Sequence, residues 1–295
     1  MKFYSSKPHY EYLHKKWTAK HKDLSDNLID KHLKHIALGS LGGLMLLTTT
    51  NLPHQAKHFI AQQTSDKITS FSSKNIVLAN KLKNQVPSEM RNLTPDEEKN
   101  IENILTDFLG SPVKASVDNI RLNRTFGLIG GEQHLYRYPG DNIYAHAKSA
   151  TDWAMFGDAG IAPHLGAWGY FASSKEEFDK EAEDQEKWYI AVQTFLSPGF
   201  AENFPQYRDF FKYRKMLVVN PDTGQAVVAD IADAGPSEWT GKHLGGSPEV
   251  MQELGLAQGP RKGAVLYFFI DDKDKKIPLG PVKLNEQQLA ENNRI

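Results

Sequence analysis

Polar and apolar residues divide the chain into four stretches. Residues 1–35 are polar, with eight lysines against four acidic residues, and residues 36–52 (IALGSLGGLMLLTTTNL) carry no charge. Residues 53–118 are polar again, and from residue 119 onward short apolar runs alternate with Gly, Pro and Asn turns. The pattern predicts a basic leader, an apolar segment, a polar stalk and a folded domain, in that order.

The apolar segment 36–52 is 17 residues long, close to the shortest length that spans a bilayer as a helix. The lysines before it predict a cytoplasmic N-terminus, with the remainder of the chain on the other side of the membrane. Cleavage near Ala56 is the alternative, and it would release the rest of the chain. A buried helix in a soluble protein is a third interpretation, which Gly39, Gly42 and Gly43 disfavour.

The clearest helix of the stalk covers residues 94–109. Thr94 is its expected N-cap, Pro95 occupies the first turn, and Gly110 ends it. An apolar stripe at helical spacing, Ile101, Ile104, Leu105 and Phe108, predicts packing against the following domain or a second copy of the helix.

Residues 119–283 predict a mainly β domain, a barrel or a sandwich, followed by a polar tail at 284–295. The strongest hairpin signal is LVVNPDTGQAVV, two apolar runs joined by the turn 220–224. Within the domain, the acidic run SKEEFDKEAEDQEKW predicts a solvated helix.

Charge and composition exclude several classes of function. Basic and acidic residues number 35 and 36, so nothing in the composition indicates a nucleic-acid partner. The chain contains no cysteine, which excludes thiolate zinc sites and cysteine nucleophiles. Four histidines lie in the folded domain, without the spacing of a zinc motif: His134, His146, His164 and His243. We therefore predict no metal or cofactor, although distant parts of the chain could still assemble a metal site.

The run AVVADIADAGP places a carboxylate at the end of an apolar strand. Val227, Ala229, Ile231 and Asp233 alternate onto one face, so Asp233 is expected at the rim of a core. Partial burial would raise the pKa of its carboxyl and suit it to act as a general acid. Asp230 faces the other way and is expected in solvent. A plain turn, with the carboxylate accepting backbone N–H bonds, remains the alternative.

The segment from residue 217 to 256 resembles the core of bacterial double-psi β-barrel domains of the rare-lipoprotein-A type. The matching positions are Asn220, Gly224, Asp233, Gly235, Pro236, Lys242, Leu244, Ser247, Leu254 and Gly255. SATDWAMFG, residues 149–157, is similar to the family's opening strand, and GAVLYFFID is similar to its closing strand. The resemblance covers roughly residues 151–271, with a long insertion at about 160–214, and implies a six-stranded double-psi β-barrel with a helical insertion.

The resemblance also implies a function. In this family and its lytic transglycosylase and expansin relatives, the aspartate matching Asp233 donates a proton to a glycosidic oxygen. The implied substrate is the glycan strand of peptidoglycan, cut by a sugar's own hydroxyl, or by water with Asp152 as a second carboxylate. The expected location is the bacterial cell membrane, single-pass through 36–52 with the domain outside the cytoplasm, or secretion after cleavage.

Two departures from the family pattern bear on activity. The aspartate of the family's Ile-Asp-Leu-Ser segment is Gly245 here, and the arginine before Gly-Pro is Ala234. A non-catalytic wall-binding or envelope-organising barrel is therefore the second hypothesis, while a peptidoglycan peptidase is disfavoured by the missing cysteine and zinc spacing. The predicted substrate-binding set is Trp239, Trp168, Tyr170, Trp153, Lys242, His243, Glu132 and His134, with the four aromatic residues as stacking platforms.

Overall fold

The computed structural model describes residues 74–282. The predictions on the leader, the apolar segment 36–52, cleavage near Ala56 and the tail lie outside the described residues. Between residues 74 and 282, no helix is both long enough and apolar enough to cross a membrane.

Strands and helices alternate along the described chain. The strands are β1 (Val113–Lys114), β2 (Ser116–Val117), β3 (Ile120–Arg121), β4 (Phe126–Gly131), β5 (Tyr189–Val192), β6 (Lys215–Val219), β7 (Ala226–Ala234), β8 (Leu244–Gly246), β9 (Lys262–Ile270) and β10 (Gly280–Pro281). The helices are 74–82, α3 (Pro95–Leu109), α4 (Ile143–His146), α5 (Ala150–Phe156), α6 (Lys180–Lys187), α7 (Phe204–Phe211) and α8 (Pro248–Glu253), with short 3₁₀ turns η2 (Gly157–Ala159), η3 (Thr194–Leu196) and η4 (Glu238–Thr240).

Six strands close into a mixed β-barrel. The order around the ring is β4, β8, β5, β7, β6 and β9, and β9 pairs with β4 again. Of the six pairs of neighbouring strands in the ring, β4 with β8 and β5 with β7 are parallel, and the other four are antiparallel. The short strands β1 and β10 extend the sheet at β9 and β7. The predicted six-stranded barrel is confirmed, but helices cover it, so the domain is mixed α/β rather than mainly β.

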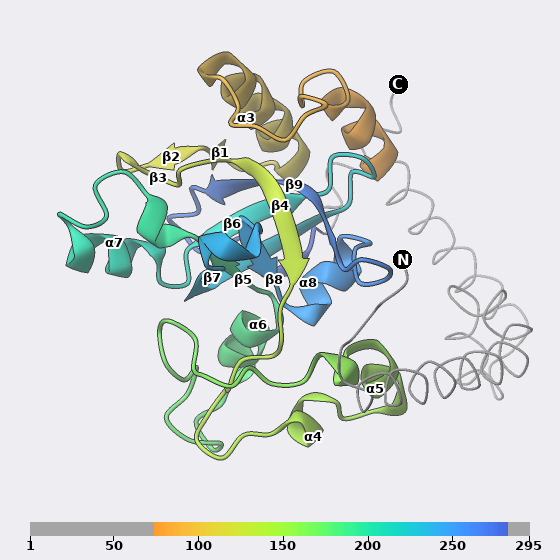
Figure 1. Cartoon of the computed structure of the whole chain (residues 1–295), viewed down its shortest axis with the longest axis vertical. Helices are drawn as coiled ribbons and strands as arrows, with labels where there is room; N and C mark the ends of the chain where they lie inside the picture. Colours follow the sequence, from red (N-terminus) through yellow and green to blue (C-terminus); the bar gives the residue numbers. More distant parts are fainter. Residues whose placement is uncertain (1–73, 283–295) are drawn as a thin grey trace, which may run out of the picture. The chain divides into compact units, whose positions relative to one another are not determined.

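Alternation along the strands separates the barrel interior from its outer face. Inward positions such as Ile129, Ile190, Ile231 and Leu244 are fully buried in one apolar cluster. Outward positions on β6, β7 and β9 form a second cluster with Ile101 and Leu105 of α3 and with Leu78 and Leu82 of helix 74–82. In Figure 1 both helices lie on one side of the barrel.

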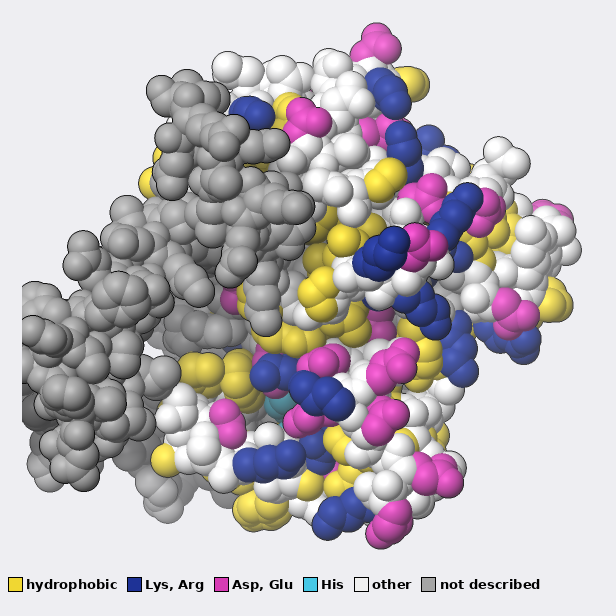
Figure 2. All heavy atoms as spheres, turned by 180° about the vertical axis from the view of Figure 1, so that it is seen from behind, with side chains coloured by type: hydrophobic (Ala, Val, Ile, Leu, Met, Phe, Trp, Pro, Cys, Tyr) yellow, Lys and Arg dark blue, Asp and Glu magenta, His cyan; other side chains and the backbone are white. Residues whose placement is uncertain are grey.

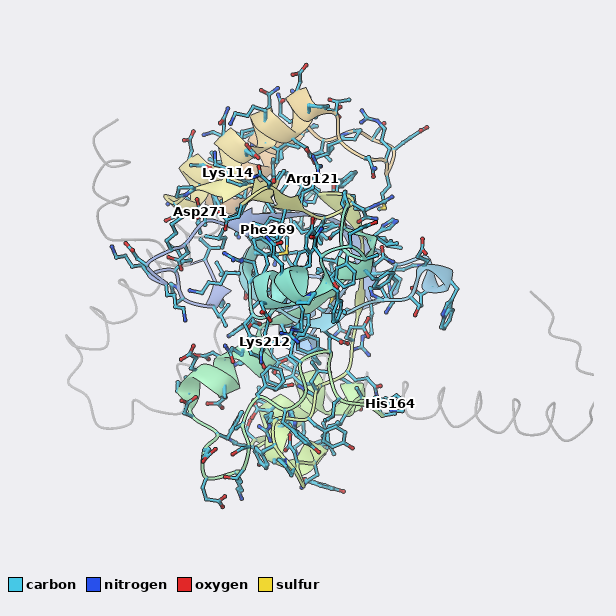
Figure 3. The ribbon with its side chains drawn as sticks, turned by 90° about the vertical axis from the view of Figure 1, so that its left-hand side faces the viewer. Lys114, Arg121, His164, Lys212, Phe269 and Asp271 are labelled. Carbon is cyan, nitrogen blue, oxygen red and sulfur yellow. The ribbon has the colours of Figure 1, made fainter. Side chains whose placement is uncertain are left out.

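Helix α3 begins and ends as the sequence predicts. Thr94 and Glu97 form a reciprocal capping box, Pro95 lies in the first turn, and Gly110 ends the helix in the left-handed conformation. The apolar stripe packs on the barrel, which is one of the two expected partners. Seen from the side (Figure 3), Lys114 and Arg121 lie beneath this helix, and His164 lies on the opposite side of the barrel.

The long insertion differs from the prediction. The stretch 149–157 carries helix α5 (Ala150–Phe156) and not the opening barrel strand, because Ser149 and Asp152 make a capping box that starts a helix. The first barrel strand is β4, upstream of them, and β5 falls within the expected insertion of 160–214. The segment 132–188, which carries α4, α5 and α6, joins β4 to β5 below the barrel (Figure 1).

Two further local predictions are confirmed. Strands β6 and β7 form the hairpin around turn 220–224, and β9 is the strand predicted from GAVLYFFID. Ser247 caps α8 by accepting the Val250 N–H. On the face turned away in Figure 1, basic and acidic side chains of the described residues are interspersed (Figure 2).

Candidate functional site

Asp233 lies near the end of β7, after an irregularity in the pairing with β5. Ile190 stands opposite Ile231, but the next residue, Ala191, stands opposite Asp233, so Ala232 is the extra residue of a β-bulge. Ile190 is an interior position, and Ala191 therefore faces outward together with Asp233. The prediction that Asp233 shares the face of Val227, Ala229 and Ile231 is thus wrong, because the bulge reverses the alternation.

The carboxyl of Asp233 is held at one oxygen. Its Oδ1 accepts the N–H groups of Ala167 and Ala234, both at 2.8 Å, and no hydrogen bond from residues 74–282 engages Oδ2. Burial raises the pKa of Asp233 above its ordinary value, and the two backbone N–H groups oppose that shift only in part. A partly buried carboxyl with one oxygen free is suited to donate a proton at a higher pH than an exposed aspartate.

Asp233 stands at the end of a row that crosses four strands. Gly130 of β4 pairs with Gly245 of β8, Gly245 pairs with Ala191 of β5, and Ala191 pairs with Asp233. Laterally paired residues present the same face of a sheet, so this row forms a floor almost free of side chains. Two strand spacings, about 10 Å at the backbone, separate Gly245 from Asp233.

Glu132 and Lys242 cover the glycine end of this floor. A Cβ built at Gly245 would lie 2.6 Å from Cδ of Glu132, and one built at Gly130 would collide with the Lys242 side chain. Lys242 Nζ donates to Glu132 Oε1 at 2.6 Å. The two glycines are required because the ion pair occupies the space of their missing side chains.

A cavity of about 300 Å³ adjoins this ion pair. Its charged lining consists of Glu132 and Lys242 with Arg261 and Lys262, three cations against one anion. The cavity therefore favours ligands that carry negative charge.

The predicted aromatic platforms differ in exposure. Trp239, in η4 just after Asp233, is 87% exposed, and Tyr170 and Trp153 are about 39% and 38% exposed. Trp168 instead packs against the barrel and donates its indole N–H to the Ile231 carbonyl at 2.9 Å. Trp239 is free to stack on a ligand, whereas Trp168 holds the insertion to β7.

Asp152 and His243 have surroundings that the sequence did not indicate. Asp152 does not lie on a barrel strand but caps helix α5, where its carboxylate accepts the Ser149 N–H. His243 packs over Gly127, and its Nδ1 accepts the Leu128 N–H at 2.9 Å, which gives it a structural role.

Asp230 was expected in solvent but is 1% exposed. Neither carboxylate oxygen has a hydrogen-bond partner within residues 74–282, and burial raises its pKa well above the ordinary range. The outward face that it occupies is covered, because α6 and the region around Tyr213 pack there.

A second polar cluster lies inside the insertion. His134 Nδ1 is 3.3 Å from Glu186 Oε1, and His146 Nδ1 is 3.4 Å from Glu186 Oε2. His146 Nε2 is 2.8 Å from Asp141, which Arg137 binds through two nitrogens. Burial alone would raise the pKa of Glu186, but hydrogen bonds from the two histidines lower it to about 2.

The sequence placed His134 in the predicted substrate-binding set but did not indicate its partners. Glu186 belongs to the acidic run that predicted a solvated helix, yet it is 4% exposed. The available signal was the density of His, Arg and Asp between residues 132 and 146, but nothing in the sequence connected that loop to Glu186.

Comparisons with known proteins do not assign a family. No protein-family profile matches the chain, and searches among curated proteins and solved structures find no significant match. Functional inference therefore rests on the geometry above and on the resemblance in the sequence.

Proposed function

We propose that the barrel is of the double-psi type and acts on the glycan strands of peptidoglycan, with Asp233 as the general acid. The observation that carries the proposal is the placement of Asp233: it is partly buried, held at Oδ1, and without a hydrogen bond at Oδ2 from residues 74–282. It stands at the end of a row of two glycines and an alanine that leads to the ion pair of Lys242 and Glu132. Its raised pKa keeps a larger fraction of the carboxyl protonated near neutral pH.

In the proposed reaction, Asp233 gives its proton to the glycosidic oxygen as the bond to the sugar's C1 breaks. A hydroxyl of the same sugar then attacks C1 and returns its proton to the Asp233 carboxylate, so one carboxyl serves as acid and then as base. The products are two shorter glycans, one of which ends in an internal anhydro ring, and no water is consumed.

Glu132 supports the same assignment. Gly245 stands where the family has an aspartate, but the Glu132 side chain fills the space next to Gly245 and supplies a carboxylate there. We infer that Glu132 contributes the polar group that position 245 lacks. The adjacent cations, Arg261 and Lys262, suit the carboxylates that peptidoglycan carries.

Incubation of the full-length protein with purified peptidoglycan, followed by mass spectrometry of the soluble products, tests this proposal. Anhydro-muropeptides that disappear with Asp233→Asn and persist with Asp222→Asn, an exposed control in the hairpin turn, are the expected result. Products that persist unchanged in Asp233→Asn contradict the role of Asp233.

A non-catalytic glycan-binding role is the second candidate. It is favoured by the ion pair between Lys242 and Glu132, which neutralises the second carboxylate, and by the exposed indole of Trp239. Co-sedimentation with peptidoglycan but no soluble product would favour this role, and absence of both would reject the substrate class.

A further inference from the structure

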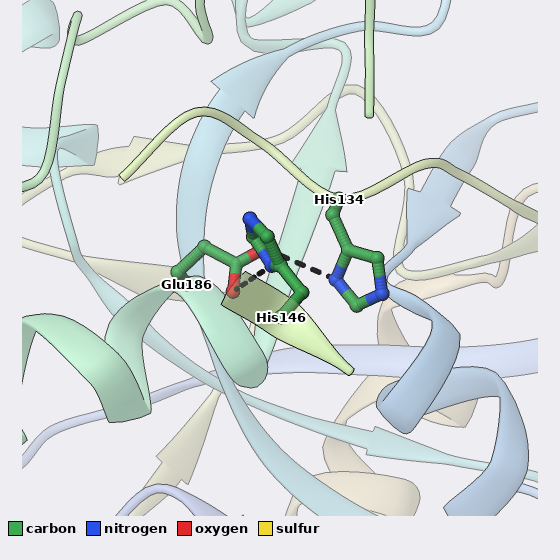
Figure 4. Close-up of side chains that lie close together, drawn as sticks. All are labelled: His134, His146 and Glu186. Carbon is green, nitrogen blue, oxygen red and sulfur yellow. Dashed lines mark hydrogen bonds and ion pairs between the residues drawn. The ribbon is translucent and has the colours of Figure 1, made fainter. Parts of the chain in front are cut away.

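The cluster of His134, His146 and Glu186 joins three separate parts of the insertion. His134 follows β4, His146 ends α4, and Glu186 lies in the last turn of α6 (Figure 4). One potential ligand atom from each residue lies within 4.8 Å of the other two. All three side chains are 5% exposed or less, so solvent does not screen them.

The distances in the cluster differ from those of its neighbours. His146 to Asp141 is 2.8 Å and Arg137 to Asp141 is 2.7 Å, as charge-assisted hydrogen bonds require. The two histidine contacts with Glu186 are longer, 3.3 and 3.4 Å. Neighbouring ligands of a tetrahedral ion with bonds of about 2.0–2.1 Å are separated by about 3.3–3.4 Å, so each of the two spacings fits a pair of ligands on one ion. The contacts run to different oxygens, Oε1 and Oε2, so an ion that binds both histidines uses both oxygens of Glu186 or a slightly rotated carboxylate.

The hydrogen bonds around Asp141 also favour a metal ion next to His146. Asp141 also accepts from Arg137 and from the Asn142 N–H, so it is a carboxylate and the proton of that contact sits on His146 Nε2. The Nδ1 atom of a neutral His146 then turns its lone pair toward an oxygen of Glu186. A second proton on His146 or a metal ion relieves this repulsion. A carboxylate behind a ligating histidine is the usual outer partner in metal sites.

The Nε2 atom of His134 has no partner among the described residues. It is buried, and no residue of the described range 74–282 forms a hydrogen bond with it. The Oε2 atom of Glu249, whose carboxylate interacts electrostatically with His134 and Glu186, is buried without a partner as well. When Nδ1 of His134 binds a metal, its proton moves to Nε2, where an acceptor is needed.

We propose that His134, His146 and Glu186 form a binding site for one divalent transition-metal ion, Zn²⁺ before others, that fixes segment 132–188 on the barrel. Two imidazoles and one carboxylate are ligands that Zn²⁺ prefers, and a fourth position remains for a water molecule. Binding requires the Nδ1 atoms of both histidines to be unprotonated. The site does not depend on the proposed glycan chemistry.

Titration of the chelator-treated, full-length protein with Co²⁺ tests this inference. One equivalent is expected to produce the intense visible spectrum of tetrahedral Co²⁺, and Zn²⁺ should abolish it. His134→Gln and Glu186→Gln should remove this spectrum, while His164→Gln, an exposed histidine in the same insertion, should keep it. The seven histidines of residues 1–58 are present in every variant, so any binding there cancels in the comparison.

Thermal unfolding of the unmodified chain provides a readout that needs no variant. Chelator should lower the midpoint by several degrees and Zn²⁺ should restore it, because an ion that binds only the folded state stabilises that state. An unmodified chain without a tetrahedral Co²⁺ spectrum, or with a midpoint indifferent to chelator and Zn²⁺, overturns the proposal. His146 then forms an imidazolium between Asp141 and Glu186.

Discussion

The Glu132 side chain occupies the space into which any side chain at Gly245 would project. Gly245 lies in β8, and Glu132 directly follows β4, the parallel neighbour of β8, in which Gly130 and Gly131 pair with Gly245 and Gly246. The glycine therefore admits the carboxylate, and the two positions depend on each other.

This dependence predicts a stability coupling between the two positions. Gly245→Ala should destabilise the native chain by roughly 1–3 kcal/mol, because the new methyl group displaces the ion-paired Glu132 side chain. In a Glu132→Ala background the same substitution should cost much less. Urea unfolding of the native chain, the two single variants and the double variant measures the coupling. Equal destabilisation by Gly245→Ala in both backgrounds would show that the contact with Glu132 is not its cause.

Asp233→Asn should lower the rate of glycan cleavage by at least about 100-fold, the typical contribution of a general acid. Because burial raises the pKa of Asp233, the native rate should decline only at a pH above the ordinary range of an aspartate. Initial rates across pH measure this limb. A rate that already falls at the ordinary pKa of an aspartate would show that burial does not raise the pKa of Asp233.

Trp239→Ala should weaken sedimentation with peptidoglycan by about tenfold, the equivalent of about 1.4 kcal/mol, and leave the unfolding midpoint unchanged. The indole is 87% exposed, so its removal costs little packing. Trp168→Phe provides the contrast, since it loses the hydrogen bond to Ile231 and should lower stability by roughly 1 kcal/mol. Unchanged binding in Trp239→Ala would remove this residue from the ligand surface.

Glu253 makes stability depend on pH. Burial raises its pKa from 4.5 to about 7, so the folded chain binds this proton more tightly than the unfolded chain. Its contribution is therefore complete below pH 4.5 and is lost as the pH rises through about 7. Glu253→Gln should remove a decline of the order of 2 kcal/mol over that window, a value reduced for partial exposure. Urea midpoints of both chains between pH 4.5 and 8 measure it.

Local sequence signals predicted the strands, turns and caps that depend on neighbouring residues. Thr94 and the turn 220–224 act within a few positions of themselves, and each was predicted correctly. Helix α5 was missed because the resemblance to a family strand was given more weight than the capping signal of Ser149 and Asp152.

The site required information that no local pattern contains. The row that joins Gly130, Gly245, Ala191 and Asp233 depends on the order of strands around the barrel. The approach of Glu186 to His134 depends on how the insertion folds back on itself. Long-range packing decided both, and one sequence by itself does not reveal such contacts.

The bulge at Ala232 makes the site sensitive to the length of a strand rather than to the identity of its residues. Deletion of one residue there would restore strict alternation and turn the carboxyl of Asp233 into the barrel interior, with every original side chain still present. A comparison of related chains should therefore count the residues between Ala229 and Gly235 before it asks whether the aspartate is retained. A chain one residue shorter there would keep the Asp-x-Gly-Pro sequence but turn its carboxyl away from the site.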